Sequence, residues 1–332
     1  MTPAELSRTV CGAVRRAVDA GELSAPVPET APVERPRPGG HGDYATGVAL
    51  RLAKAAGRDP RQVADILRPH LGAHPAVARV DVTGPGFLNI TLAERPDVAA
   101  QIRRLGPAYG HGDALQGVTA ELRVPREARA QLLAAVVARL AATQGGQVHV
   151  RDAASPAEAT LRPVPAGPDA TETLLGADAY HWALLATPAG DRPRTAGLLA
   201  QTDANELFRV RYAHARTRAL LRNAAALGLA PAEQPGADTG PDTDPDAAPL
   251  ATALADHPTA LAAAARLHAP DRLARHLVVI ADAVLDLQHT ALPLGDRKPS
   301  AGHRTRLALA EAAGTVLAAG LSLLGVSAPE HL

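Results

Sequence analysis

The sequence contains little cysteine, lysine or aromatic side chain. Its single cysteine, Cys11, excludes an internal disulfide framework and a cysteine-rich zinc site. Basic charge is almost all arginine, and the formal net charge is zero. This argues against a protein that is basic over its whole surface, but a local basic face remains compatible with it. Aromatic residues make up only 2% of the chain, so few rings are available to stack on nucleobases.

Motifs of catalysis and long hydrophobic runs are also scarce. The sequence has no glycine-rich phosphate loop followed by lysine and no Gly-x-Ser-x-Gly elbow. We therefore expect no cofactor, and we expect no metal because no ligand-type residues recur at metal-site spacing. No stretch looks long and apolar enough to span a bilayer, and the N-terminus lacks the apolar core of a signal peptide. These absences predict a cytoplasmic protein without a membrane partner.

The most informative stretch is residues 206–228, ELFRVRYAHARTRALLRNAAALG. Its apolar positions recur at spacings of three and four, which predicts one long helix with a buried face. Asp203 is the expected N-cap and Gly228 the expected end. Arginines flank the apolar face on both sides, namely Arg211, Arg218 and Arg222 on one edge and Arg209 and Arg216 near the other. Such a helix can meet a polyanion, but the same arginines also suit an ordinary solvated face.

The first hundred residues predict a compact α+β domain. Glycine turns are expected at 39–43 and 84–86. Helices are expected at 3–20, 43–56, 60–71 and 96–105, and strands at 77–82 and 87–92, with a short strand near Val33.

The rest of the chain predicts one βαβ unit followed by helices. A strand at 118–124, a helix at 125–143 and a strand at 147–151 form the βαβ unit. Residues 230–249 are rich in Asp, Pro, Gly and Thr, which predicts a disordered acidic loop. Helices at 250–255, 258–267, 270–291 and 305–324 would form a bundle with the 206–228 helix.

Three motifs at the C-terminal side resemble arginyl-tRNA synthetases. Residues 212–216, YAHAR, resemble the segment that opens the DALR anticodon-binding domain of that family. Residues 175–185, LGADAYHWALL, look like its GADALRYFLL stretch, and residues 306–332 are similar to its C-terminus. The resemblance implies an RNA-binding role for Arg211, Tyr212, His214, Arg216, Arg218 and the terminal Leu332, which stands where the family has methionine.

The N-terminal region resembles the additional domain of the same family. Residues 42–46, GDYAT, and 84–89, GPGFLN, match its motifs. Since that domain contacts the tRNA elbow, the resemblance implies that Phe87 and Asn89 contact RNA. The alternative is that Phe87 belongs to the core and Asn89 caps a turn.

The middle of the chain departs from the family where the chemistry should be. The HVGH motif is absent, since residues 123–129 read RVPREAR, and no KMSKS-type loop follows. In the family these histidines stabilise the phosphates of ATP in the transition state. We therefore expect no catalytic residues. The predicted fold class is α+β, with an N-terminal α+β domain (1–110), a remnant of a Rossmann-like α/β core (111–200) and an all-α anticodon-binding bundle (201–332).

Three functions remain open on sequence grounds. The first is a non-catalytic tRNA-binding protein, with a tRNA of the arginine type as its partner. The second is an active arginine–tRNA ligase, and the third is a protein-interaction scaffold that has lost RNA and binds a protein partner instead.

Overall fold

The structure, a computed structural model, describes residues 3–34, 36, 42–93, 97–232, 244–295 and 297–332. Contacts divide the chain into two compact units, Met1–Pro96 (unit 1) and Asp97–Leu332 (unit 2). The predicted middle segment 111–200 therefore shares unit 2 with the C-terminal helices. The chain is mixed α/β with a helical C-terminal part, which confirms the coarse prediction of fold.

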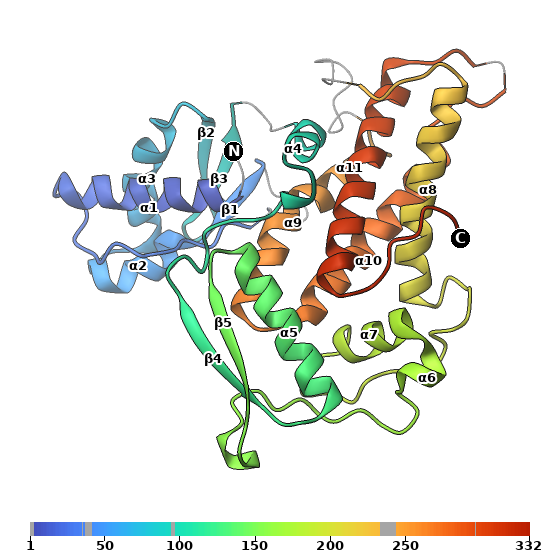
Figure 1. Ribbon diagram of the computed structural model, residues 1–332. Coiled ribbons are helices and arrows are strands. Elements are labelled where there is room, and N and C mark those ends of the chain that lie inside the picture. Colours follow the sequence, from blue (N-terminus) through green and yellow to red (C-terminus); the bar gives the residue numbers. More distant parts are fainter. Residues whose placement is uncertain (1–2, 35, 37–41, 94–96, 233–243, 296) are drawn as a thin grey trace. The chain divides into compact units, whose positions relative to one another are not determined.

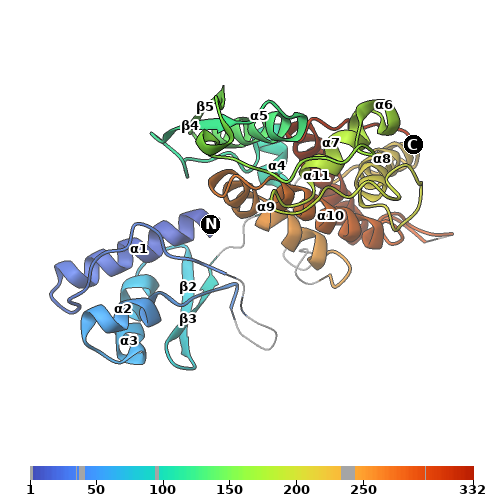
Figure 2. The ribbon, with the colours of Figure 1, turned by 90° about the horizontal axis from the view of Figure 1, so that it is seen from below.

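Unit 1 combines helices with an antiparallel sheet of strand order β1-β3-β2. Helices α2 and α3 pack on the sheet, and α1 packs on α3 (Figure 2). The apolar stripe of α1 is buried in this core, as its spacing predicts. The elements are α1 (Pro3–Asp19), β1 (Tyr44–Thr46), α2 (Val48–Ala56), α3 (Pro60–Gly72), β2 (Val77–Thr83) and β3 (Phe87–Leu92).

The glycine turn between β2 and β3 is required by packing. Gly86 has φ +131°, and a Cβ there would lie 2.7 Å from the carbonyl oxygen of Pro60. Any larger residue would push the hairpin away from the start of α3. The hairpin in turn fixes Phe87 opposite Thr83 at the beginning of β3.

The predicted helix 43–56 is wrong in its first part. Tyr44–Thr46 forms β1, which pairs with β3, and the helix begins only at Val48. Asp43 donates its N–H to the Ile90 carbonyl and accepts the Leu92 N–H, so cross-strand bonds replace a helical turn. A three-residue strand is too short to give a periodic signal. The short strand predicted near Val33 is a single bridge between Glu34 and Ala45.

Unit 2 combines a parallel βαβ unit with a helical bundle (Figure 1). Helix α8 packs on α10 and α11, α10 packs on α9, and α5 packs on β5, α7 and α9. The elements are α4 (Val98–Leu105), β4 (Thr119–Val124), α5 (Ala128–Thr143), β5 (Gln147–Asp152), α6 (Glu172–Leu175), α7 (Ala177–Leu185), α8 (Glu206–Ala226), α9 (Ala248–Arg266), α10 (Pro270–Leu287) and α11 (Ala301–Leu323), with short 3₁₀ turns at Gly106–Ala108 and Pro156–Glu158.

Helix α9 runs through Pro258, so the predicted break between 255 and 258 is wrong. Proline has no N–H for the carbonyl four residues earlier, which is that of Leu254. The buried Tyr109 hydroxyl donates to this carbonyl at 3.1 Å. A side chain from outside the helix therefore satisfies the acceptor that proline leaves open, and the helix continues.

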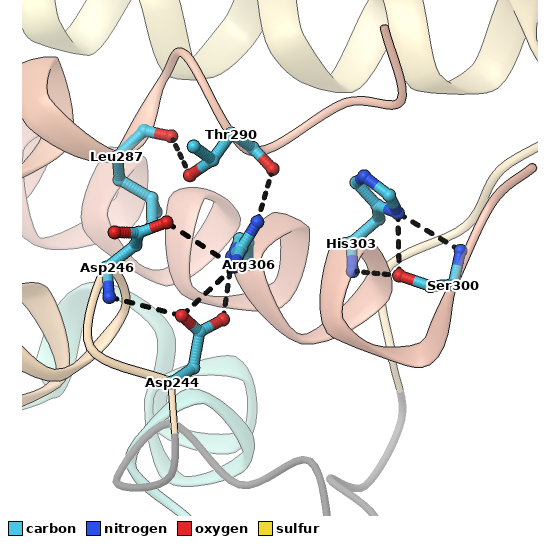
Figure 3. Close-up of polar contacts among 7 residues, drawn as sticks. All are labelled: Asp244, Asp246, Leu287, Thr290, Ser300, His303 and Arg306. Atoms are coloured by element: carbon cyan, nitrogen blue, oxygen red, sulfur yellow. Dashed lines mark hydrogen bonds and ion pairs between the residues drawn. The ribbon is translucent and has the colours of Figure 1, made fainter. Parts of the chain in front are cut away.

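An arginine joins the start of the α9 segment to α10 and α11 (Figure 3). Arg306 binds both carboxylate oxygens of Asp244, at 2.7 and 3.0 Å, and the Thr290 carbonyl at 2.8 Å. Burial alone would raise the pKa of Asp244, but the bonds from Arg306 and from backbone N–H groups hold it below its ordinary value. The end of the predicted acidic loop is thus fixed, whereas its residues 233–243 lie outside the described part of the chain.

Helix α11 contradicts the expectation that no stretch could span a bilayer. Within the described residues it is the one helix with the length and apolar composition to do so, and 61% of that stretch is buried inside the protein. An Ala-, Gly- and Leu-rich helix in the centre of a bundle meets the same test as a membrane span. Packing of α11 against α8, α10 and α4 accounts for its composition here.

Candidate nucleic-acid interface

Helix α8 buries the predicted apolar face in the bundle. Leu207, Val210 and Ala213 are at most 3% exposed. Thr217 meets Gly314 of α11, where a Cβ would lie 2.6 Å from its Oγ1, so glycine permits the close approach of the two helices. The N-cap is Asn205 and not the predicted Asp203. An amide suits this position because Asn205 accepts the Phe208 N–H while donating to the Leu198 and Ala200 carbonyls, which a carboxylate cannot do.

Every arginine of α8 has a partner inside unit 2. On one margin Arg209 pairs with Asp282 at 3.2 Å, and Arg216 donates to Gln288 at 2.8 Å. On the other margin the partners belong to α7 and to the C-terminal segment. They are Asp178 and Ser327 for Arg211, Glu330 for Arg218 and His331 for Arg222.

The segment Gly325–Leu332, called the C-terminal segment below, leaves α11 and crosses α8 (Figure 1). Its first part is held by α7. His181 Nδ1 donates to the Gly325 carbonyl at 2.7 Å, and Asp178 accepts from the Ser327 N–H at 2.7 Å and from its hydroxyl. Since Asp178 also pairs with Arg211, one carboxylate connects α7, α8 and the C-terminal segment.

The second part of the C-terminal segment lies on α8 itself. His214 is 5% exposed and donates from Nδ1 to the Pro329 carbonyl at 2.8 Å. Burial lowers the pKa of His214, and the bond to Pro329 only partly offsets this effect. The imidazole is therefore neutral at pH 7 and acts as a hydrogen-bond donor without charge.

A pocket of about 270 Å³ opens where α7, α8 and the C-terminal segment meet. Its lining includes Asp178, Phe208, Arg211, Leu199 and Leu332. The Phe208 ring stacks on Tyr212, with centroids 5.5 Å apart and planes 12° apart. An aromatic face, an arginine and apolar side chains around one hollow are the groups that hold an unstacked nucleobase.

The other predicted contacts, Phe87 and Asn89, lie in unit 1. Phe87 is 40% exposed, and its ring lies 3.5 Å from where a Cβ on Gly47 would stand. Asn89 is only 5% exposed and donates to the Thr83 hydroxyl. Of this pair, Phe87 offers a surface to a partner.

Two carboxylates of the βαβ unit are hydrogen-bonded, one at the start of α5 and one at the end of β5. At the start of α5 the Glu127 carboxylate accepts the N–H groups of Arg129 and Ala130, at 3.0 and 2.9 Å. At the end of β5, Asp152 is bound by Arg126 and Gln131.

Arg129 anchors the segment that follows β5. It is fully buried, and burial lowers its pKa from the ordinary arginine value. Its five N–H donors all bond to carbonyl oxygens, those of Val164, Leu184, Thr187, Pro188 and Asp191. Arg129, which lies beside the place where the family has its histidine motif, therefore has a structural role in connecting α5 to the segment that follows β5.

The structure brings together most of the predicted RNA-binding residues. Arg211, His214, Arg218 and Leu332 meet along the C-terminal segment, Tyr212 supports Phe208, and Arg216 lies on the opposite margin. The sequence pattern did not single out Asp178, Phe208 or Glu330. Asp178 lies in the GADA stretch. An acidic residue shortly before an arginine-rich helix is the sequence feature that could have indicated it as a partner of an arginine.

Sequence comparison matches the two ends of the chain to two family models. Residues 5–92 match the arginyl tRNA synthetase N terminal domain, and residues 210–332 match the DALR anticodon binding domain. The arginine–tRNA ligase of Frankia alni is 36% identical over 229 residues, covering 61% of this chain and 41% of that protein. That of Renibacterium salmoninarum is 50% identical over 122 residues, covering 35% of this chain and 22% of that protein. The chain thus spans about two fifths or less of the length of these relatives.

Structural comparison gives the same fold. Arginyl-tRNA synthetase from Thermus thermophilus aligns with a TM-score of 0.68 at 14% identity. The enzyme from Plasmodium falciparum aligns with a TM-score of 0.64 at 9% identity. Each alignment covers 100% of both chains. At these identities the similarity concerns the fold alone.

Proposed function

We propose that this chain, which carries the N-terminal and DALR domains of the arginyl-tRNA synthetase family, is a non-catalytic tRNA-binding protein of the cytoplasm. It binds a tRNA of the arginine type through its two end domains. The three-part division at 110 and 200 belongs to this proposal, with the middle part as a remnant of a catalytic core.

The observation that carries the non-catalytic part is the closed start of α5. In open α/β sheets, ligands bind outside the carboxyl ends of the strands, and phosphates bind at helix N-termini. Here the Glu127 carboxylate takes the first N–H groups of α5, and Asp152 at the end of β5 is bound by Arg126 and Gln131. Negative charge at both places opposes a nucleotide phosphate.

The α8 surface supports the RNA-binding part. Arg211 and Arg218 can contact phosphates, and a base can enter the pocket between Phe208 and Leu332. Phe87 adds an exposed ring on unit 1. Arg216, Tyr212, His214 and Asn89 complete the proposed set, with Asn89 acting from a largely buried position.

The test of this surface is the salt dependence of tRNA binding. Each arginine–phosphate contact adds roughly 0.7 to 0.9 to the slope of log K against log salt. We expect Arg211→Ala/Arg218→Ala to weaken binding of purified tRNA(Arg) and to flatten that slope. The matched control is Arg123→Ala/Arg151→Ala, which removes two exposed arginines paired with Glu121 on the sheet. An unchanged slope in the α8 variant would remove these arginines from the interface.

A protein-interaction scaffold is the second candidate. It is favoured by the intramolecular partners of all the α8 arginines, together with the zero net charge. It predicts a stoichiometric protein complex and no tRNA binding in the titration above.

An active arginine–tRNA ligase is the remaining alternative. It would exchange pyrophosphate with ATP when arginine is present. We expect no such exchange, because Glu127 and Asp152 hold the positions where the phosphates would lie. Exchange above the background measured without arginine would show a working adenylation site.

A further inference from the structure

We propose that the Glu330 and His331 side chains, in the outer half of the C-terminal segment, cover Arg218 and Arg222, and that RNA must displace these side chains to reach the two arginines. This proposal rests on the proposed function and states how the same surface is regulated. It follows from the unequal way in which the two halves of the segment are held. The half Gly325–Ser327 is called the anchor, and the half Pro329–His331 is called the tip.

The anchor is held firmly. Val326 is 4% exposed, and Ser327 gives two hydrogen bonds to Asp178, which is charged and pairs with Arg211. Bonds to an ionised carboxylate are about twice as strong as neutral ones. Gly325 has φ +71°, and a Cβ there would lie 2.9 Å from His181 Nδ1, so the chain turns toward α8 in one fixed way.

Apart from the bond that His214 donates to the Pro329 carbonyl, the tip is held by exposed contacts. Glu330 pairs with Arg218 at 3.0 Å, with side chains 55% and 44% exposed. The Nδ1 atom of His331 lies 3.4 Å from Nη2 of Arg222. Exposed ion pairs contribute only about 0.2–1 kcal/mol, because water screens them and two flexible side chains must be ordered. The Glu330 and His331 side chains can therefore leave the arginines while the anchor and the backbone of the tip stay in place.

Glu330 occupies the position that a phosphate would take. It offers carboxylate oxygens and negative charge to Arg218, which are the features that an arginine recognises in a phosphodiester. The bond from His214 Nδ1 to the Pro329 carbonyl keeps the backbone of the tip on α8, so Leu332 stays beside the pocket. In the free protein Glu330 thus neutralises Arg218, and RNA replaces one anion by another.

Competition of this kind predicts that removing the charge of Glu330 strengthens RNA binding. We expect Glu330→Gln to bind purified tRNA(Arg) about two- to five-fold more tightly than the wild type at low salt. The gain should shrink at high salt, where the Glu330–Arg218 pair is already screened. The matched control is Glu311→Gln, since Glu311 pairs with Arg103 at 3.0 Å with similar exposure but lies between α11 and α4.

Three outcomes of the titration are distinct. Tighter binding by Glu330→Gln with an unchanged Glu311→Gln supports the cover. Equal or weaker binding by Glu330→Gln, while the wild type binds, overturns it. If no variant binds tRNA, the proposed function fails, and the cover is then tested without RNA.

That second test uses ¹⁵N NMR and sodium tripolyphosphate as a compact polyanion. The cover predicts shifted amide signals for Glu330 and His331 and an unchanged signal for Ser327. Unchanged signals for Glu330 and His331, or an equal change at Ser327, would overturn the division into anchor and tip.

Discussion

At the scale of single residues, one hydroxyl decides whether a helix continues. Pro258 provides no N–H for the Leu254 carbonyl, and the Tyr109 hydroxyl takes that place from a different part of unit 2. A buried carbonyl without a donor costs about 1–3 kcal/mol. Tyr109 is 4% exposed, so water cannot substitute for its hydroxyl.

This contact gives a prediction for a double-mutant cycle. Tyr109→Phe should lower the free energy of unfolding by about 1–3 kcal/mol. In a Pro258→Ala background the cost should be much smaller, because the N–H of the new residue can bond to Leu254 within the helix. Urea unfolding followed by fluorescence of Trp182, which lies in the core of unit 2, measures both values. An equal cost in the two backgrounds would contradict the account.

Residue pairs of this kind could not be predicted from the sequence. Tyr109 and Leu254, or Arg218 and Glu330, are far apart in the chain, and no local spacing connects them. Asp203 and Asn205 both fit an N-cap pattern, and only the loop carbonyls that Asn205 binds decide between them. The sequence was sufficient to predict the arginine-rich helix. The partners of its arginines could be identified only from the folded structure.

At the scale of elements, α9 and α10 meet around two neutral histidines. The rings of His257 and His276 stack with centroids 5.4 Å apart, and the Tyr109 ring also stacks on His257, with centroids 6.0 Å apart. Burial lowers the pKa of His257 to about 3, with His276 and His111 adding to the effect, and burial lowers that of His276 to about 4. His257 Nδ1 and His276 Nε2 have no hydrogen-bond partner among the described residues.

These values predict how stability depends on pH. Both histidines have pKa near 6.5 when unfolded, so at higher pH they are neutral in both states and have no effect. Below pH 6.5 the two histidines become protonated in the unfolded chain. In the folded chain His276 stays neutral until the pH falls to about 4, and His257 until it falls to about 3. Stability is therefore lost as the pH falls through this window, by about 1.4 kcal/mol per pH unit for each histidine.

The measurement is urea unfolding of unit 2, followed by Trp182, from pH 7 to pH 4.5. His276→Phe should reduce the slope by about half, and His289→Gln, which changes an exposed histidine at the end of α10, should leave it unchanged. The idea fails if the wild type shows no loss of stability in this window.

The accuracy of the predicted elements followed the length of their pattern. Helices α1, α3, α5 and α8 have long apolar stripes, and their bounds agree with the predictions to within about three residues at each end. Strand β1 has three residues, and it is defined by its pairing with β3 and with Glu34. The prediction divided α9 into two helices because proline usually ends a helix. The hydroxyl that replaces the missing N–H donor belongs to Tyr109, which lies outside the local sequence pattern.

At the scale of the whole molecule, the predicted domains and the family resemblance came mostly from motifs near the two ends of the chain. Residues 5–92 and 210–332 match domains of arginyl-tRNA synthetases, as the resemblance implied. The middle part was less predictable, because its role depends on contacts such as those of Glu127 and Arg129. Glu127 caps the start of α5, and Arg129 connects α5 to α7. These contacts support the proposal of a remnant core.

The central claim is that the chain binds tRNA of the arginine type without activating arginine. An anisotropy titration of the wild-type protein with labelled tRNA(Arg), at two salt concentrations and against an unrelated tRNA, tests it most directly. The account predicts tighter binding to tRNA(Arg) that weakens steeply as salt rises. No binding at micromolar protein, or equal binding to both tRNAs, would contradict it.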